Sequence, residues 1–234
     1  IPVHWTNCYI ASKDQPLPEL QQEIDNLDKN YKYFIVSTHD DAPRQKLPEG
    51  TVCFSAGGNA GDIAIPLACS SIQDPPIAEK DIFCSFMGSV THPARVMMIH
   101  ALKDNPKYQL GFKSWSPVVT GEDEATYKDT MSRSTFSLCP RGYGLTSYRL
   151  YEAMQLNSIP VYVSDKFWLP WESELDWNEF CVLVPVWRLP EIEMMLEAIT
   201  PEQISAMQSK MREVYDSHFT IPKITEKIVS LIKV

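Results

Sequence analysis

The stretch Phe136-Ser-Leu-Cys-Pro-Arg-Gly-Tyr-Gly-Leu-Thr-Ser-Tyr-Arg-Leu-Tyr-Glu-Ala-Met-Gln-Leu-Asn-Ser-Ile-Pro-Val-Tyr-Val-Ser-Asp165 decides the fold of this chain. Its pattern predicts a strand, a glycine-bearing loop, a helix and a second strand in succession. The strands are expected over Phe136–Cys139 and Ile159–Val163, and the helix from a cap at Thr146 or Ser147 to about Leu156, with Asn157 as its stop. Serine and threonine cap helices well, and glycine lets a loop approach a ligand closely.

The junction between this loop and its helix predicts an anion site. A helix N-terminus carries free N–H groups and partial positive charge, which suit a phosphate. Arg141 in the loop and Arg149 in the first helical turn are expected to reach the same anion. Glu152 lies three residues after Arg149, where its carboxylate could accept hydrogen bonds from a ribose diol. The spacing equally allows a weak surface ion pair between Arg149 and Glu152.

Strands and helices alternate along the rest of the chain. Further strands are expected over Tyr33–Ser37, Val52–Ser55, Asp81–Met87 and Tyr108–Phe112, with Ile63–Pro66 a strand or an ordered loop. Further helices are expected over Leu17–Asn30, His92–Lys103 and Glu122–Arg133. We interpret Ile1–Ile10 as a first strand and loop, and the glycine-rich Gly57–Gly61 as a turn, because no helix pattern follows it directly. The alternation predicts parallel sheets with right-handed crossovers.

Prolines predict where the chain is divided. The segment Gln73–Ile77 contains paired prolines, which stop both helix and strand, and it is the expected linker. The tail from Glu191 to Val234 is expected to be helical, with Pro190, Pro201 and Pro222 in first turns.

Composition limits the classes of function. The chain has 234 residues and a net charge of −9, which makes a nucleic-acid backbone an unfavourable partner. No apolar run approaches the roughly 20 residues of a membrane span. The six cysteines are scattered without zinc-type spacing, so we expect buried free thiols and no metal site. These cysteines and the absence of an Asn-x-Ser/Thr sequon favour a reducing compartment.

Several blocks of the chain carry a family resemblance. They are Cys139-Pro-Arg-Gly142, Ser147-Tyr-Arg-Leu-Tyr-Glu-Ala-Met154, Ile159-Pro-Val-Tyr-Val-Ser-Asp165 and Leu169-Pro-Trp-Glu-Ser-Glu-Leu-Asp-Trp-Asn-Glu-Phe180. Together they resemble the exostosin-like glycosyltransferases, family 47, and the likeness is dense from about Lys80 to Phe219. The resemblance implies an α/β fold of the GT-B type, with two Rossmann-like domains whose parallel sheets face each other across a cleft.

In that scheme the N-terminal domain of this chain is reduced. We expect a small acceptor-side domain over residues 1–77, a domain that binds the nucleotide-sugar donor over 78–220, and a C-terminal helix over 221–234 that packs back on the N-terminal domain.

The resemblance also implies an activity. It is the inverting transfer of a sugar from a UDP-sugar to a hydroxyl of an oligosaccharide or glycoprotein glycan, without a metal or other cofactor. For a short soluble member we expect xylose or galactose as the sugar and a cytoplasmic location, or the Golgi lumen if an N-terminal anchor has been trimmed. A catalytically silent member that binds a nucleotide-sugar as partner of another transferase is the alternative. A nucleotide-dependent oxidoreductase is disfavoured, because Gly142-x-Gly144 lacks a third glycine.

Eight residues are expected to bind the donor, from the resemblance and from the anion-site pattern. They are Gly88, Arg95, Arg141, Gly142, Thr146, Ser147, Arg149 and Glu152. Gly88 and Arg95 belong to a second strand–glycine–helix unit that is similar to another block of the family. Asp165 is open to two interpretations, as a ligand of donor or acceptor or as the residue that closes a turn.

The catalytic base is expected after the strand Tyr33–Ser37, in Thr38-His-Asp-Asp41. Asp40 is the first choice and His39 and Asp41 follow, because an inverting transfer needs one group to take the acceptor proton. The alternative is that these residues cap a turn. Many members of the family show an aspartate–histidine pair before this strand, where this chain has Lys32 and Tyr33. His4 and Asp62 also lie in the small domain and stay open as further candidates.

Aromatic side chains near these motifs are expected to serve packing rather than sugar binding. This applies to Phe167, Trp168 and Trp171. For the rings of Tyr143 and Tyr148 the alternative is stacking near uracil, and core packing is the expected role there too.

Overall fold

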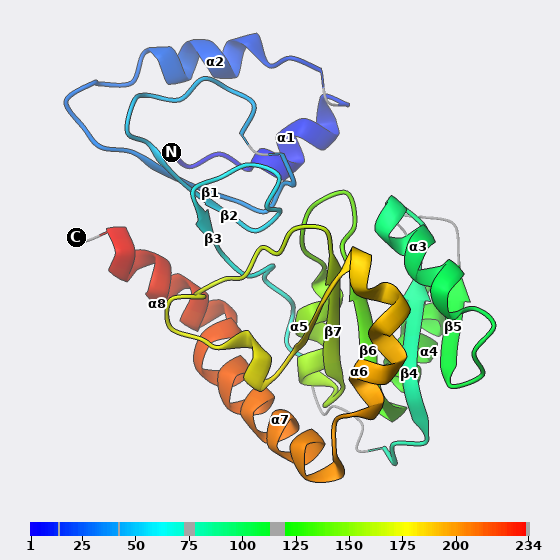
Figure 1. The fold of residues 1–234 in the computed structure, drawn as a ribbon. Helices are drawn as coiled ribbons and strands as arrows, with labels where there is room; N and C mark the ends of the chain where they lie inside the picture. The colour runs from blue at the N-terminus through cyan, green and yellow to red at the C-terminus, as the bar shows by residue number, and fades with distance from the viewer. Residues whose placement is uncertain (14, 42, 73–77, 113–119, 233–234) are drawn as a thin grey trace.

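The computed structural model describes residues 1–13, 15–41, 43–72, 78–112 and 120–232, and they form two parallel α/β units (Figure 1). The smaller unit is N-terminal and holds the helices α1 and α2 and a three-stranded sheet in the order β1-β2-β3. Its elements are α1 (Trp5–Ala11), α2 (Pro18–Asp25), β1 (Phe34–Ser37), β2 (Val52–Ser55) and β3 (Ile63–Ala64). The expected linker, Gln73–Ile77, lies outside the described residues.

The larger unit is a five-stranded parallel sheet in the order β5-β4-β6-β7-β8. Its strands are β4 (Ile82–Gly88), β5 (Tyr108–Phe112), β6 (Ser134–Pro140), β7 (Ile159–Ser164) and β8 (Val182–Pro185). Its helices are α3 (Pro93–Leu102), α4 (Gly121–Arg133), α5 (Tyr148–Gln155), α6 (Ile192–Glu197), α7 (Pro201–Val214) and α8 (Ile221–Ile232). Short turns lie between them: the 3₁₀ turns η1 (Trp177–Glu179) and η2 (Val186–Glu191) and the π-helical turn η3 (Tyr215–Phe219).

The strand order creates a switch point between β4 and β6. From β4 the chain first crosses to β5 on one side and then to β6 on the other, so the carboxyl ends of β4 and β6 lie side by side where the direction of winding reverses. In open α/β sheets ligands bind at such a point. The predicted α/β fold with parallel sheets is therefore confirmed. The switch point predicts a ligand site at the loops that follow β4 and β6.

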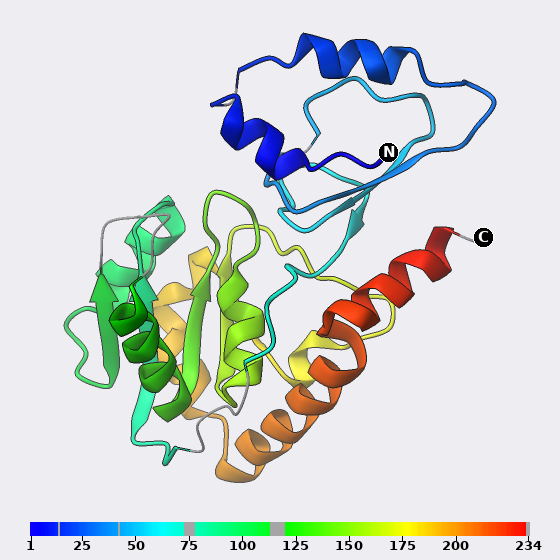
Figure 2. The ribbon, with the colours of Figure 1, turned by 180° about the vertical axis from the view of Figure 1, so that it is seen from behind.

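Helices cover both faces of the larger sheet. The helices α4 and α5 pack on one face, while α3 and α6 lie on the other, as the two opposite views show (Figures 1 and 2). One hydrophobic cluster joins α5, α7 and α8 to residues of the smaller unit, among them Phe54 and Ile65. A second cluster lies between the sheet and α3 and α6. Among the described residues we find no helix with the length and apolarity that a bilayer crossing requires.

The helix α5 follows its sequence pattern closely. The side chain of Ser147 caps it by accepting a hydrogen bond from the Arg149 amide, which decides between the two predicted caps. Leu150, Ala153 and Met154 are buried on its apolar face. Asn157 has a φ of 55°, a left-handed conformation that asparagine tolerates and that ends the helix.

Two predictions for the N-terminal segment are wrong: one assigned the wrong kind of secondary structure, and the other made a helix too long. The segment Ile1–Ile10, expected to be a strand and loop, contains the helix α1. Trp5 and Tyr9 are its buried residues, and their spacing of four places both aromatic rings on the core side of a helix. The second helix was expected to reach Asn30 but ends at Asp25, because Asp28 accepts a hydrogen bond from the Asn30 amide in a turn.

Two C-terminal features also differ from the sequence prediction. Pro190 lies inside the 3₁₀ turn η2 instead of the first turn of a helix, whereas Pro201 and Pro222 lie in first turns as predicted. The short edge strand β8 was not predicted, although its Val-Leu-Val run closed by Pro185 is a strand pattern.

The carboxyl end of β2 in the smaller unit and the turn after it meet the loop that follows β6 and the segment that follows β7. The Leu145 amide donates to the Gly57 carbonyl at 2.8 Å, and the Trp168 indole N–H donates to the Ser55 carbonyl at 2.9 Å. Gly57 is required by close approach, since a Cβ there would lie 2.3 Å from the Cα of Asp40. The smaller unit is thus held directly against the β6–α5 loop of the larger one.

Candidate active site

Three arginines gather around the switch point. Arg95 comes from the first turn of α3, Arg141 from the residue after β6, and Arg149 from the first turn of α5. Their side chains are largely buried, with 8%, 7% and 9% of the residue surface exposed. Arginine is seldom buried without a partner, so the contacts of each guanidinium decide its role.

Arg149 lies over aromatic rings and against the end of β4. Its guanidinium carbon is 4.7 Å from the centre of the Phe86 ring and 5.7 Å from that of Tyr127, and one Nη donates to the Met87 carbonyl. A Cβ on Gly88 would lie 2.8 Å from this Nη, so glycine is needed for the guanidinium to reach its place. The Arg149 Nε is buried without a hydrogen-bond partner among the described residues.

Arg95 holds the two loops of the switch point together. Its Nε donates to the Arg141 carbonyl at 3.0 Å, and its two Nη atoms donate to the carbonyls of Ser89 at 2.7 Å and Pro140 at 3.4 Å. These contacts join the loop after β4 to the loop after β6. Burial, and then repulsion from Arg149, lower the pKa of Arg95 to about 10. A Cβ on the nearby Gly142 would lie 3.3 Å from Arg95 Nη2, a close contact that would require the guanidinium to shift by a few tenths of an ångström.

The charges at this point are not balanced. Within the described ranges, neither Arg95 nor Arg149 forms an ion pair with a carboxylate, and the two guanidinium groups repel each other. Arg141, in contrast, is paired with Asp165 at 2.6 Å. Burying uncompensated charge is costly. The arrangement therefore favours an anion beside Arg95 and Arg149.

Glu152 lies one helical turn after Arg149, but the two do not form the surface ion pair that the spacing allowed. Arg149 is buried and contacts rings and a carbonyl, while one Glu152 oxygen accepts a hydrogen bond from the Tyr127 hydroxyl at 2.6 Å. Sequence reasoning missed Tyr127, because the contact joins residues that are 25 positions apart.

The remaining predicted donor residues line the same junction. Ser147 caps α5, and Gly142 follows Arg141 in the loop. Thr146 is buried, and its hydroxyl lies beside that of Tyr151. All eight predicted donor-binding residues thus lie at the carboxyl ends of β4 and β6 or in α3 and α5, the helices that follow these strands.

Asp40 approaches this junction from the smaller unit. It lies after the carboxyl end of β1, is partly buried, and lies beside the Gly144 amide, which favours its ionised form. A Cβ on Gly144 would lie 2.0 Å from the Asp40 Oδ1 atom, so glycine is required here by close approach. Burial is the largest effect on the Asp40 carboxyl and raises its pKa above the ordinary value. A carboxylate with a raised pKa is suited to accept a proton.

The neighbours of Asp40 have other contacts. Burial raises the pKa of Asp41, but hydrogen bonds from Asn59, Tyr143 and Arg44 outweigh this and leave it lowered. His39 packs its ring edge-on against Tyr9, and its Nδ1 atom accepts a hydrogen bond from the Asp41 amide at 3.2 Å. Asp41 is thus held as an anion by three donors.

Asn59 joins the two units beside Asp41. Its amide nitrogen donates to Asp41 at 3.0 Å and to the Tyr143 carbonyl at 3.3 Å, and its oxygen accepts from Arg141 at 3.5 Å. Sequence reasoning interpreted the surrounding Gly57–Gly61 only as a turn. The further base candidates lie elsewhere: Asp62 accepts from the Cys53 amide of β2, and His4 precedes α1.

The aromatic predictions have mixed outcomes. Trp168 and Trp171 are packed, as expected, and Phe167 packs against the core cluster. The expectation of core packing is wrong for Tyr143 and Tyr148, which are 60% and 50% exposed. The Tyr143 hydroxyl reaches out to donate to Asp41 at 2.9 Å, a long-range contact that explains its exposed position.

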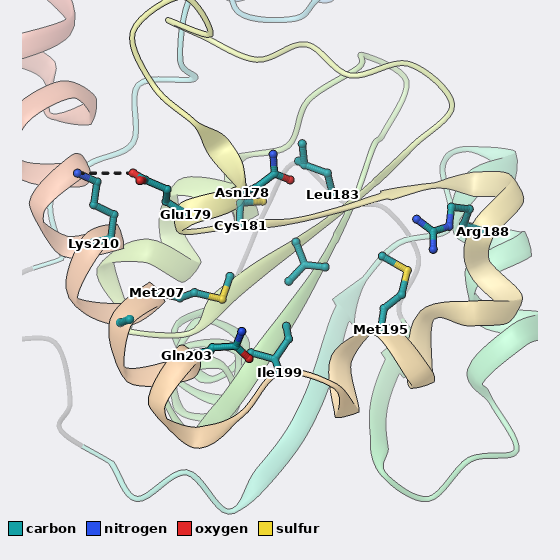
Figure 3. A pocket seen from close by; sticks show the side chains of 12 residues that line it. Asn178, Glu179, Cys181, Leu183, Arg188, Met195, Ile199, Gln203, Met207 and Lys210 are labelled. Carbon is teal, nitrogen blue, oxygen red and sulfur yellow. Dashed lines mark ion pairs between the residues drawn. The ribbon is translucent and has the colours of Figure 1, made fainter.

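Two cavities lie away from this junction. One, of about 650 Å³, lies beside the edge strand β8 between α6 and α7, with Met195, Ile199 and Met207 inside it and Lys210 at its rim (Figure 3). The other, of about 410 Å³, is lined by the Glu172–Asn178 segment and Leu183. Neither includes a predicted donor or base residue.

Comparison with known protein families decides the assignment. The family model of the exostosin GT47 domain matches residues 48–199, a span that includes the switch point, both of its loops and α5. The chain belongs to the exostosin GT47 family. Its two parallel α/β units have the GT-B type of architecture that the resemblance implied.

Individual relatives of this exostosin GT47 chain share only 26–31% of the aligned residues with it. It is 26% identical to a probable glycosyltransferase of Arabidopsis thaliana, over 81% of this chain and 39% of the relative. It is 27% identical to a probable glucuronosyltransferase of Oryza sativa subsp. japonica, over 62% of this chain and 35% of the relative. It is 31% identical to Exostosin-1 of Drosophila melanogaster, over 47% of this chain and 15% of the relative. The matched part therefore spans about two fifths or less of these relatives.

Among solved structures the likeness is weak. TarM is similar with a TM-score of 0.47 and 10% identity, over 73% of this chain and 39% of that one. The pneumococcal O-GlcNAc transferase GtfA, solved with UDP and GlcNAc, is similar with a TM-score of 0.47 and 12% identity, over 92% of this chain and 46% of that one. Membership of the exostosin GT47 family rests on the family model instead.

The contacts of Arg95 give a testable prediction. Replacing Arg95→Lys removes the planar fork that reaches three carbonyls, and the free energy of unfolding is expected to fall by about 1.5–3 kcal/mol, the range for hydrogen bonds to charged groups. Urea unfolding with linear extrapolation measures it. The matched control is Arg188→Lys, whose exposed pair with Glu191 should contribute less than about 0.5 kcal/mol. Equal losses in the two variants would show that Arg95 does not hold the loops.

Proposed function

We propose that this chain is an inverting glycosyltransferase that moves a sugar from a UDP-sugar to a hydroxyl group of a glycan acceptor without a metal ion. The observation that carries the proposal is the pair of buried guanidinium groups, Arg95 and Arg149, at the β4–β6 switch point with no carboxylate as an ion-pair partner among the described residues. Membership of the exostosin GT47 family supports sugar transfer as the reaction, and the names of its relatives support the same class.

The diphosphate of the donor fits this pair. When the bond from the sugar C1 to the diphosphate oxygen breaks, negative charge develops on that oxygen and must be stabilised. The N-terminus of α5 and the guanidinium of Arg149 supply positive charge there, and Arg95 and Gly142 shape the loop. Since these groups stabilise the leaving diphosphate, the proposal requires no metal.

The ribose of the nucleotide is assigned to Glu152. This carboxylate lies one turn along α5 from Arg149, so a nucleotide whose phosphates bind at the helix start can place its ribose beside it. One Glu152 oxygen is engaged by Tyr127, and the other has no hydrogen bond within the part of the chain that the structure describes. That oxygen is available to a ribose hydroxyl.

Asp40 is the proposed base. The acceptor oxygen attacks the sugar C1 from the side opposite the diphosphate, a C–O bond forms as the bond to the diphosphate breaks, and the Asp40 carboxylate takes the hydroxyl proton. Burial raises the pKa of Asp40, and the Gly144 amide orients it against the loop of the donor site. Asp41 is a weaker candidate, because Asn59, Tyr143 and Arg44 already bind its carboxylate.

Specificity for the donor sugar depends on a few contacts to its hydroxyl groups, so the sugar must be identified by a screen of donors. We propose a neutral sugar, xylose or galactose. UDP-glucuronic acid is the comparison donor, because the rice relative is named a probable glucuronosyltransferase.

The first prediction for this function is binding of UDP without a metal. UDP at a hundred times its dissociation constant should add about 2.7 kcal/mol to the free energy of unfolding, and EDTA should leave this unchanged. Thermal unfolding of the protein with UDP, recorded with and without EDTA, measures this stabilisation. Turnover of UDP-xylose, UDP-galactose and UDP-glucuronic acid, again with and without EDTA, measures the activity. Loss of both binding and turnover in EDTA would contradict the metal-free proposal.

The second prediction separates catalysis from binding. Asp40→Asn should lower turnover by roughly a hundredfold to ten-thousandfold while UDP affinity survives, because the base is lost but the anion site remains. Since burial raises the Asp40 pKa, the ionised carboxylate is disfavoured in the folded state, so Asp40→Asn should keep or raise the unfolding temperature near neutral pH. Wild-type activity should fall as the pH drops through this raised pKa, where the base becomes protonated.

Asp62→Asn is the control for that experiment, because Asp62 also belongs to the smaller unit but bonds the Cys53 amide. It should keep both turnover and the acid limb of the pH profile. Near-normal turnover of Asp40→Asn would show that another group is the base.

A further inference from the structure

Tyr127 links the two residues assigned to the nucleotide. It comes from α4, and neither the family blocks nor the loop pattern includes it. Its hydroxyl donates to Glu152 Oε2 at 2.6 Å, while its ring lies under the Arg149 guanidinium at 5.7 Å. One side chain from a separate helix therefore contacts both proposed ligands, the carboxylate for the ribose and the guanidinium for the phosphate.

The hydrogen bond fixes the rotation of the Glu152 carboxylate. A glutamate side chain has three rotatable bonds, so an unrestrained carboxylate would lose entropy when it binds a ligand. With Oε2 held by the phenol, the second oxygen points in a defined direction without any hydrogen bond from the described residues. A carboxylate oriented before the ligand arrives binds hydroxyl groups more tightly, because less freedom is lost on binding.

The surroundings keep the phenol as the donor in this bond. Burial is the main cause that holds the pKa of Tyr127 well above its ordinary value, while the Arg149 charge opposes this and the Glu152 charge adds to it. The Glu152 charge also acts on Cys69, Cys139 and Tyr148, and burial is the largest cause that raises the pKa of each of them. These phenols and thiols therefore stay protonated near neutral pH, and the Tyr127 hydroxyl keeps the proton that it donates to Glu152.

We propose that Tyr127 is a positioning residue that presents the Glu152 carboxylate to the ribose hydroxyls of the donor, and so makes the site select ribonucleotides over deoxyribonucleotides. This inference rests on the proposed function. It adds to that function the residue that sets the selectivity and the group of the ligand that is read.

Tyr127→Phe tests the hydrogen bond by itself, because the ring that packs under Arg149 is kept. Titration calorimetry compares UDP, 2′-deoxy-UDP and inorganic diphosphate on four proteins: the wild type, Tyr127→Phe, Glu152→Ala and Tyr108→Phe. Tyr108 is the matched control, since its hydroxyl is buried in β5 without a hydrogen-bond partner among the described residues.

The wild type should prefer UDP to 2′-deoxy-UDP by about 10-fold or more, and Glu152→Ala should lose this preference. Tyr127→Phe should reduce the preference by roughly 2- to 10-fold, the worth of one neutral-donor hydrogen bond, and leave the affinity for diphosphate unchanged. Tyr108→Phe should match the wild type for all three ligands.

The possible failures are distinguishable. If Tyr127→Phe keeps the full preference, or weakens all three ligands equally, Tyr127 is a packing residue and the inference is overturned while UDP binding stands. If the wild type binds UDP but does not prefer it to the deoxy form, Glu152 does not read the ribose, which also overturns the inference. If the wild type binds neither UDP nor diphosphate, the proposed function itself fails, and the inference with it.

Discussion

Repulsion between two buried guanidinium groups is the constraint on which the rest of the site depends. Arg95 and Arg149 both contact the Phe86 ring, at 5.9 and 4.7 Å, and no carboxylate pairs with either in the described part of the chain. Carbonyl groups and aromatic rings compensate them only in part, because neither carries a full negative charge. Glycine at position 88 follows from this packing, since a larger residue would displace the Arg149 guanidinium. A bound diphosphate would supply the missing charge.

The smaller unit completes the site from the other side. The carboxyl end of β1 brings Asp40 to the Gly144 amide, so a raised-pKa carboxylate and the proposed phosphate loop are in direct contact. The adjacent Asn59 ties Asp41 and Tyr143 into one network across the two units. Loops at the carboxyl ends of two parallel sheets therefore meet, and each sheet contributes one half of the proposed site: the proposed base from one and the proposed anion site from the other.

Local patterns predicted the strands β2 and β5 to the residue, because periodicity determines them. They also predicted the stop at Asn157 and limited the cap of α5 to Thr146 or Ser147, of which the structure shows Ser147. Local sequence patterns could not predict the side-chain contacts of the site. The bond from Tyr127 to Glu152, the three carbonyls around Arg95 and the reach of Tyr143 to Asp41 all join residues that are distant in sequence. The helix α1 was missed because its aromatic content resembles a strand, whereas the spacing of its buried rings is helical.

A crystal structure of this chain with UDP tests the central claim most directly. The account predicts the diphosphate against the Gly142 loop and the start of α5, within hydrogen-bond reach of Arg149, and the ribose hydroxyls on the free oxygen of Glu152. UDP bound in the cavity beside β8, or anywhere else out of reach of Arg149, would contradict the account.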